Sequence, residues 1–149
     1  MADLLESRHG ELRAGIPRDE RAATHAFALT GVAMMEALIG CWDAKYYYWF
    51  IRPSQANTAI TLSFALPNHP SYPSGHSCVS SAAATALSHL FPTKTSEVDA
   101  WLTEAGLSRM YAGIHYRFDI TAGKELGVSV ARRTIALDRN IGLLAAIER

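Results

Sequence analysis

The chain has 149 residues with 14 basic and 14 acidic side chains, so its formal net charge is zero. This balance removes the electrostatic case for nucleic acid or an anionic membrane surface as the main partner. Apolar residues make up 49% of the chain and charged residues 19%, which is typical of a packed globular domain and argues against a disordered one. We expect a single domain over residues 1–149, in which residues 1–17 form an accessory N-terminal segment.

Helical patterns dominate the N-terminal third of the chain. Residues 2–14 have the pattern of a short amphipathic helix, and a long apolar helix is predicted to begin after Pro17 and to run to about residue 50. Its buried side would consist of five apolar residues: Phe27, Val32, Met35, Ala37 and Leu38. Charged residues interrupt this apolar stretch, which argues against a membrane span, and the N-terminus has no signal-peptide pattern. We therefore expect a soluble, cytoplasmic protein.

The middle of the chain alternates between loop and helix signals. Residues 53–73 contain four prolines and predict a loop. An Ala-rich helix is expected from residue 74 to about residue 90, and Ser96 is expected to cap a further helix over residues 97–107. A last long helix is expected from about residue 119 to residue 137.

Strand signals are weak. The best run, residues 58–62, has no partner run nearby and cannot form a sheet by itself. The predicted fold class is therefore all-α, a helical bundle of about five helices. The two cysteines, Cys41 and Cys78, do not make a disulfide framework, and we expect both to be buried thiols.

The first charged cluster is Lys45 and Arg52, seven positions apart, with Pro53 directly after. Seven residues make about two helical turns, so a continuous helix would place both cations on one face. Burying two cations is costly unless they meet an anion. Taken alone, the pair is better explained by side chains that snorkel at the helix surface.

The second cluster is the run Pro73-Ser74-Gly75-His76-Ser77, where the proline-rich loop enters a helix. Free N–H groups and a positive dipole suit a helix N-terminus to an anion. Ser74 would add a hydroxyl, Gly75 would let the backbone approach closely, and His76 would donate a proton. An ordinary serine cap followed by a surface histidine explains the run equally well.

The third cluster is Ser108-Arg109 followed by His115 and Asp119, which are four positions apart. If the last helix begins early enough, the carboxylate of Asp119 can accept the imidazole N–H of His115. That bond would fix the tautomer and leave the other ring nitrogen free as a nucleophile. A local surface pair of little energetic value is the alternative.

The three clusters are weak singly but specific together, because they occur in one order on successive helical segments. The chain resembles the superfamily of type 2 phosphatidic acid phosphatases and vanadium-dependent haloperoxidases. The resemblance covers about residues 22–136. It rests on Lys45 through Arg52-Pro53, on Pro73-Ser74-Gly75-His76, and on Ser108-Arg109 through His115 and Asp119.

The resemblance implies an anion site. Lys45, Arg52 and Arg109 would hold the oxygens of phosphate or vanadate. Ser74 and the backbone N–H of Gly75 would add hydrogen bonds to the same oxygens. Three cations and a helix N-terminus suit the charge of a phosphoryl transition state, and no divalent metal is required.

The resemblance also implies the catalytic roles. His115 would attack phosphorus, or would ligate vanadium if vanadate is bound. Asp119 would orient His115, and His76 would be the general acid for the leaving group. A phosphatase of this kind needs no cofactor, whereas a haloperoxidase would need vanadate.

Phosphatase and haloperoxidase are the two leading functions. Trp42 and His69 resemble halide-side residues of haloperoxidases, although a buried tryptophan and a loop histidine explain them as well. The short intervals between the clusters resemble small acid phosphatases. We therefore place a phosphate monoesterase with a phosphohistidine intermediate first and a vanadate-dependent haloperoxidase second.

An inactive phosphate-binding fragment is the third reading, and a membrane lipid phosphatase is disfavoured because no span is expected. The expected partner is a small phosphorylated substrate, or a phosphate or vanadate anion, without nucleic acid or membrane. A bundle of this size would expose an apolar face, which predicts a homodimer.

Overall fold

The computed structural model describes residues 20–141, and the described residues are helical with no strand. This confirms the all-α prediction; the helix expected over residues 2–14 lies outside the described residues. Two short elements lie between the long helices, α3 (Pro53–Ala56) and the 3-10 turn η1 (Pro92–Lys94). The long helices are α2 (Glu20–Tyr48), α4 (Gly75–Leu90), α5 (Thr95–Tyr111) and α6 (Arg117–Ile141).

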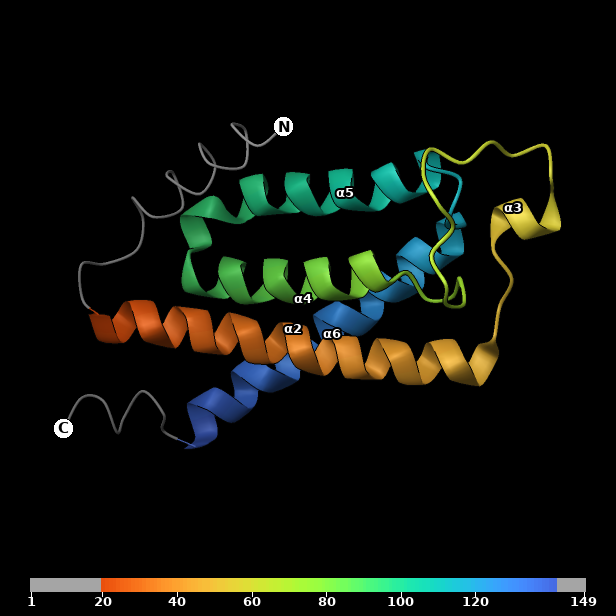
Figure 1. Cartoon of the computed structure of the whole chain (residues 1–149). Coiled ribbons are helices and arrows are strands. Elements are labelled where there is room, and N and C mark those ends of the chain that lie inside the picture. The colour runs from red at the N-terminus through yellow and green to blue at the C-terminus, as the bar shows by residue number, and fades with distance from the viewer. Residues whose placement is uncertain (1–19, 142–149) are drawn as a thin grey trace.

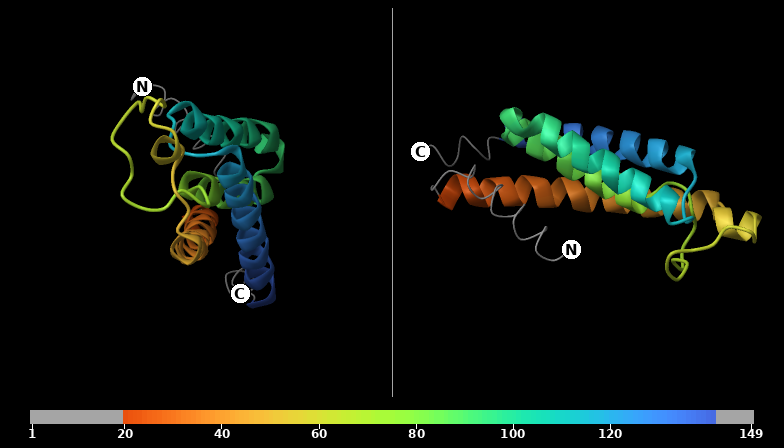
Figure 2. Two further views of the ribbon diagram at one scale, coloured as in Figure 1. Left: turned by 90° about the vertical axis from the view of Figure 1, so that its right-hand side faces the viewer. Right: turned by 90° about the horizontal axis from the view of Figure 1, so that it is seen from above.

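Helix α4 lies at the centre of the bundle. It packs against α2, α5 and α6, and α2 also packs against α6. Consecutive long helices run in opposite directions, and α5 lies on the side of α4 away from α2 (Figure 1 and Figure 2). This arrangement gathers the C-terminal ends of α2 and α5 and the N-terminal ends of α4 and α6 at one end of the bundle (Figure 1).

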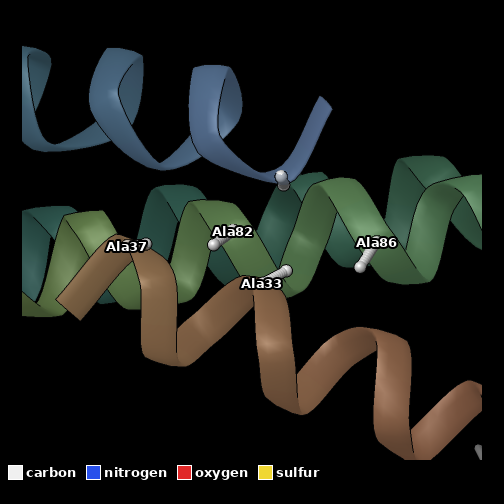
Figure 3. Packing of buried hydrophobic residues seen from close by; sticks show 5 residues of the cluster. Ala33, Ala37, Ala82 and Ala86 are labelled. Carbon is white, nitrogen blue, oxygen red and sulfur yellow. The ribbon is translucent and has the colours of Figure 1, made fainter. Parts of the chain in front are cut away.

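Small side chains hold the three inner helices close together. One core cluster consists of five alanines without exposed surface: Ala33, Ala37, Ala82, Ala86 and Ala131. Figure 3 shows the four from α2 and α4 between these two helices. On α6, a Cβ added at Gly127 would lie 2.1 Å from the carbonyl oxygen of Cys78 on α4. Only glycine allows the two backbones to approach this closely. The close packing of α4 and α6 fixes the relative positions of their N-terminal ends.

The long apolar helix ends two residues earlier than predicted. Trp49 adopts a left-handed backbone with φ of 47°, and its N–H donates to the carbonyl of Lys45 at 3.0 Å. A left-handed residue is a common way to end a helix, although glycine is the usual choice. Arg52 therefore does not continue the helix face of Lys45 but immediately precedes α3.

The start of α5 also differs from the sequence expectation. Ser96 does not cap the helix; α5 begins at Thr95 after Lys94, whose side chain makes no capping bond. The reason is the turn η1, which leads directly into α5 and is tied to it by the Thr95 hydroxyl donating to the Pro92 carbonyl at 2.9 Å. The helix then extends to Tyr111, so Arg109 lies in its last turn.

The expected buried side of α2 was partly wrong. Ala37 is buried as predicted and Leu38 is partly buried, but Phe27, Val32 and Met35 are 51–71% exposed. The helix instead buries further small residues such as Ala33. The segment Glu20–Ala56 also contains an 18-residue window with a mean hydropathy of 1.4, of which 22% is buried. By length and composition alone this helix could cross a membrane, so the sequence reading that it falls short of a span is corrected.

Candidate active site

His76 lies in the first turn of α4 and Asp119 in the first turn of α6, at the end of the bundle where the helix ends gather. His115 Nδ1 lies 2.9 Å from Asp119 Oδ2, and both side chains are buried. The surface-pair alternative is therefore excluded. With Nδ1–H donating to the carboxylate, the lone pair of the other ring nitrogen, Nε2, is free for a nucleophilic role.

The pair forms although His115 lies before the helix. Helix α6 begins at Arg117, so Asp119 is its third residue. Asp119 Oδ2 also accepts the backbone N–H of Tyr116 at 3.0 Å, as a carboxylate does in a capping box. One carboxylate thus caps α6 and orients the imidazole.

Ser71 is a site residue that the sequence analysis missed. Its hydroxyl donates to Asp119 Oδ2 at 2.5 Å and lies 3.5 Å from His115 Nδ1, and the side chain is fully buried. Ser71 lies in the proline-rich loop, where a serine is normally explained as a turn residue. Only its position beside the carboxylate reveals the role, so no sequence pattern could have identified it.

Lys45 and Arg52 are buried, so neither side chain snorkels to the surface. Lys45 Nζ donates to the carbonyls of Pro70 and Ser71 at 2.7 and 3.0 Å. Burial lowers the pKa of Lys45 to about 8. Among the described residues, no carboxylate lies within salt-bridge distance of either cation, and buried cations without a counter-charge suit an anion site.

Arg52 connects the anion site to the histidine. Its Nη1 donates to the carbonyl of Ile114 at 2.7 Å and lies 3.5 Å from His115 Nε2. Its Nε donates to the carbonyl of His69 at 3.1 Å. These bonds hold the guanidinium against the nitrogen that Asp119 leaves free.

The environment of His115 favours its neutral form. Burial lowers the pKa of His115 below its usual 6.5, and the charges of Arg52 and Lys45 add to this shift. The hydrogen bond and charge of Asp119 act in the opposite direction but are weaker than the burial effect. A neutral imidazole is the form that can act as a nucleophile.

The N-terminus of α4 supplies the second cluster. Ser74 caps the helix, and its hydroxyl oxygen accepts the N–H of Ser77 at 3.4 Å. Its backbone N–H donates to the carbonyl of Asp119 at 3.0 Å, which ties α4 to α6. The serine-cap reading is thus correct, while the hydroxyl hydrogen of Ser74 is free to be donated to an anion.

His76 and Arg109 lie together at the outer edge of the site. Arg109 Nη1 is 3.4 Å from His76 Nε2, and its guanidinium lies 5.7 Å from the centre of the Phe64 ring. Burial and the charge of Arg109 lower the pKa of His76. Arg109 Nε donates to the hydroxyl of Ser108 at 3.0 Å, which directs the guanidinium from the last turn of α5.

Trp42 and His69 also border the site. Their rings are 5.1 Å apart, and His69 Nδ1 lies 3.2 Å from Arg52 Nη2. Burial and the charges of Lys45 and Arg52 lower the pKa of His69. A Cβ added at Gly75 would lie 3.2 Å from the Trp42 ring, so the glycine leaves room for the indole against the start of α4.

A cavity of about 340 Å³ opens onto these residues. His115, His76 and Gly75 line it together with His69 and Trp42. Five of the predicted residues do not line the cavity but are connected to its lining by the contacts described above: Lys45, Arg52, Ser74, Arg109 and Asp119. The predicted set is therefore one connected site, in which the histidines face the cavity and the buried cations lie behind them.

Comparison with known proteins identifies the same family. Residues 23–142 match the family model described as the PAP2 superfamily. Two relatives, non-specific acid phosphatases of Salmonella typhi and Salmonella typhimurium, are 36% and 34% identical over 89 residues. Each match covers 57% of this chain and 36% of the relative, so the chain spans little more than a third of their length.

Solved structures show the same fold. A bacterial vanadium-dependent iodoperoxidase is 31% identical with a TM-score of 0.68, over 75% of this chain and 33% of that one. Aquifex aeolicus LpxE is 23% identical with a TM-score of 0.67, over 76% of this chain and 68% of that one. At that identity the second match supports the fold alone.

Proposed function

The chain belongs to the PAP2 superfamily, and on that premise we propose that it is a soluble, metal-independent phosphatase that hydrolyses phosphate monoesters through a phosphohistidine. One observation carries the proposal. His115 is buried and bonded to Asp119 through Nδ1, while its Nε2 lies 3.5 Å from the Arg52 guanidinium. A free nitrogen beside a cation can attack an anionic phosphorus centre that the cation holds.

In the first step His115 Nε2 attacks phosphorus. A P–N bond forms and the P–O bond to the leaving group breaks, while protonated His76 gives its proton to the leaving oxygen. Asp119 stabilises the positive charge that develops on the imidazole. This step leaves the phosphoryl group on His115 and releases an alcohol.

In the second step a water molecule attacks the phosphohistidine. Neutral His76 accepts a proton from the water, the P–N bond breaks, and phosphate is released. Throughout both steps the charge on the three equatorial oxygens needs stabilisation. Lys45, Arg52 and Arg109 supply it with the N–H of Gly75, so the reaction needs no metal.

The identity to two acid phosphatases favours hydrolysis over oxidation. The cytoplasmic location stays a prediction from the sequence, since the segment Glu20–Ala56 is long and apolar enough to cross a membrane. Since the chain spans a limited part of those relatives, an anion-binding domain without turnover is a separate outcome that the experiment below identifies.

A vanadate-dependent haloperoxidase is the second candidate function. It is favoured by the 31% identity to an iodoperoxidase and by the paired rings of Trp42 and His69. The buried cations without carboxylate partners fit an oxyanion of this kind, which Lys45, Arg52 and Arg109 would hold with His115 as the ligand. Bound vanadate would supply halide oxidation by hydrogen peroxide.

The test is hydrolysis of 4-nitrophenyl phosphate in chelator-treated buffer, from acidic to neutral pH, with and without orthovanadate. We expect turnover that vanadate inhibits and that His115→Ala abolishes. His89→Ala is the matched control, because His89 lies in the last turn of α4 and contacts Arg139 instead of the site.

The outcomes separate the three functions. Turnover retained in His115→Ala contradicts the phosphohistidine mechanism. Absence of turnover from folded protein, with bromide or iodide oxidised when vanadate and peroxide are added, supports the haloperoxidase. Vanadate binding without either activity identifies an anion-binding domain.

A further inference from the structure

The cavity at the active site has an apolar wall that the proposed chemistry does not use. Its volume is about 340 Å³. Beside the histidines and the start of α4, the wall consists of apolar side chains from α2, the proline-rich loop, α4 and the segment before α6: Leu38, Trp42, Phe64, Pro67, Val79 and Ile114.

The two reactive histidines determine which part of a bound substrate faces this wall. His115 and His76 line the same cavity, so the nucleophile and the general acid both face it. The phosphoryl group must lie next to His115, and the leaving oxygen must lie next to His76. The organic group attached to that oxygen is then directed into the remaining, apolar part of the cavity.

Resting on the proposed function, we infer that the site selects phosphate monoesters of small apolar alcohols or phenols over those of polyols and sugars. Pockets that bind drug-sized ligands measure about 300–1,000 Å³, so this cavity accommodates a phosphoryl group and one small apolar group. Each methylene buried against such a wall contributes about 0.8 kcal/mol of binding, about a fourfold gain in affinity.

Polyol groups are disfavoured because most polar groups of the wall already have partners. His69 Nδ1 contacts Arg52 and the carbonyl of Pro70, and His76 contacts Arg109. Besides the histidines, Ser80 supplies a hydroxyl among the residues that line the cavity. A substrate with several hydroxyls would therefore lose hydrogen bonds to water that the wall does not replace.

Leu38 and Phe64 are the specificity-determining residues. Leu38 extends from α2 into the cavity, four residues before the partly buried Trp42. Phe64 belongs to the proline-rich loop and lies against Arg109, so it joins the apolar wall to a cation of the anion site. Neither side chain contacts the reacting atoms, and both contact the group that leaves.

The first experiment compares n-butyl phosphate with glycerol 1-phosphate. Both are esters of primary alcohols and are similar in size, and they differ by polar hydroxyls. We expect kcat/KM for butyl phosphate to be at least tenfold higher. A native enzyme that uses glycerol 1-phosphate equally well or better overturns the inference.

A matched pair of variants locates the preference. Leu38→Asn introduces a polar group into the wall, and we expect it to reduce the butyl-to-glycerol ratio threefold or more. Ile39→Asn is the control, because the adjacent Ile39 is 58% exposed and does not line the cavity. If the two variants change the ratio equally, the wall is not the cause and the assignment to Leu38 is overturned.

A binding measurement separates this inference from the proposed activity. Calorimetry with methyl-, ethyl- and butylphosphonate should give a Kd that falls about two- to fourfold with each added methylene. A Kd that does not depend on chain length overturns the inference even if the enzyme hydrolyses 4-nitrophenyl phosphate. Chain-length dependence without hydrolysis of any ester supports the apolar wall and rejects the phosphatase.

Discussion

At the residue scale, a single carboxylate oxygen of Asp119 holds three parts of the site together. Its Oδ2 accepts from His115, from Ser71 and from the backbone of Tyr116, and the whole side chain is buried. The donors from Ser71 and Tyr116 stabilise the carboxylate, and they thereby limit how strongly it raises the basicity of the His115 imidazole. Ser71 is therefore a positioning residue for His115 and not a catalytic one.

We predict that Ser71→Ala lowers kcat about tenfold with little change in KM. Without the hydroxyl, the Asp119 carboxylate has one donor fewer and interacts more strongly with the imidazolium, so the pKa of His115 rises. The acidic limb of the pH–rate profile then moves to higher pH. Steady-state kinetics across pH measure both effects. Ser54→Ala is the control, because the Ser54 hydroxyl is buried without a partner among the described residues. An unmoved acidic limb contradicts the positioning role.

The pH dependence of the native enzyme follows from two lowered pKa values. His115 must be neutral, so kcat/KM rises as pH increases through its pKa, which lies below 6.5. His76 must be protonated, so kcat/KM falls as pH increases through its pKa, which burial and Arg109 also place below 6.5. We predict an acidic optimum with activity already declining at pH 6.5. A profile that still rises above neutrality would reject His76 as the acid, and His76→Asn should remove the declining limb.

That the predicted site residues lie close together was predictable from the sequence, but the contacts that bring them together were not. The clusters containing Lys45, His76 and His115 do gather at one site, as the resemblance implied. The reasoning for Lys45 and Arg52 as one helix face was wrong, because Trp49 ends the helix between them. The roles of Ser71 and of the buried carbonyls depend on contacts between distant segments, which local spacing does not encode.

At the element scale, close contacts between α4 and α6 determine the geometry of the site. These helices carry Ser74 and Asp119 at their N-terminal ends, and the two residues are joined by a backbone hydrogen bond at 3.0 Å. The four long helices of the described residues were predictable from periodicity, whereas the short helix α3 lies in the segment predicted to be a loop. The close approach of α4 and α6 was not predicted, because a glycine within a helical pattern can equally mark a position of low helix stability.

We predict opposite effects for two glycine-to-alanine substitutions in helices. Gly127→Ala would place a Cβ 2.1 Å from the Cys78 carbonyl, and we expect the free energy of unfolding to fall by about 3 kcal/mol or more. Gly31→Ala is the matched control, because nothing lies within 4 Å of an added Cβ there. There we expect a gain of about 0.5–1 kcal/mol from helix propensity. Urea unfolding measures both, and a neutral Gly127→Ala would show that α4 and α6 are not in close contact.

At the scale of the whole molecule, the outer face of α2 is largely exposed in the part of the chain that the structure describes. Phe27, Val32, Met35 and Ile39 are 51–71% exposed along this helix, although nearly half of the chain is apolar. Periodicity identified α2 as apolar but placed Phe27 and Met35 on the wrong side. The error has a physical cause: alanines pack against α4 and α6 because they permit close approach, and the large side chains are left outside.

An exposed apolar face of this size is a candidate interface, and the homodimer expected from the sequence would use it. We predict that the chain sediments with twice the mass of one chain, and that the double variant Phe27→Glu/Met35→Glu sediments as a monomer. The reason is that a dimer through α2 would bury four unpaired carboxylates. Tyr111→Glu is the control, because Tyr111 is also a large exposed residue, at 81%, but it ends α5. Helix α5 lies on the side of α4 away from α2 (Figure 1).

Sedimentation in the presence of phospholipid vesicles tests whether the exposed face of α2 binds lipid instead of a second chain. The 18-residue window of the segment Glu20–Ala56 is apolar enough for a bilayer, so cosedimentation of the native chain with vesicles would assign the face to lipid. A native chain that stays monomeric at all concentrations and does not bind vesicles contradicts both uses. Because the core alanines of α2 lie on the opposite face from Phe27 and Met35, the glutamate variants should keep their helical circular dichroism. Loss of the dimer with an unchanged helical signal therefore reports the interface and not unfolding.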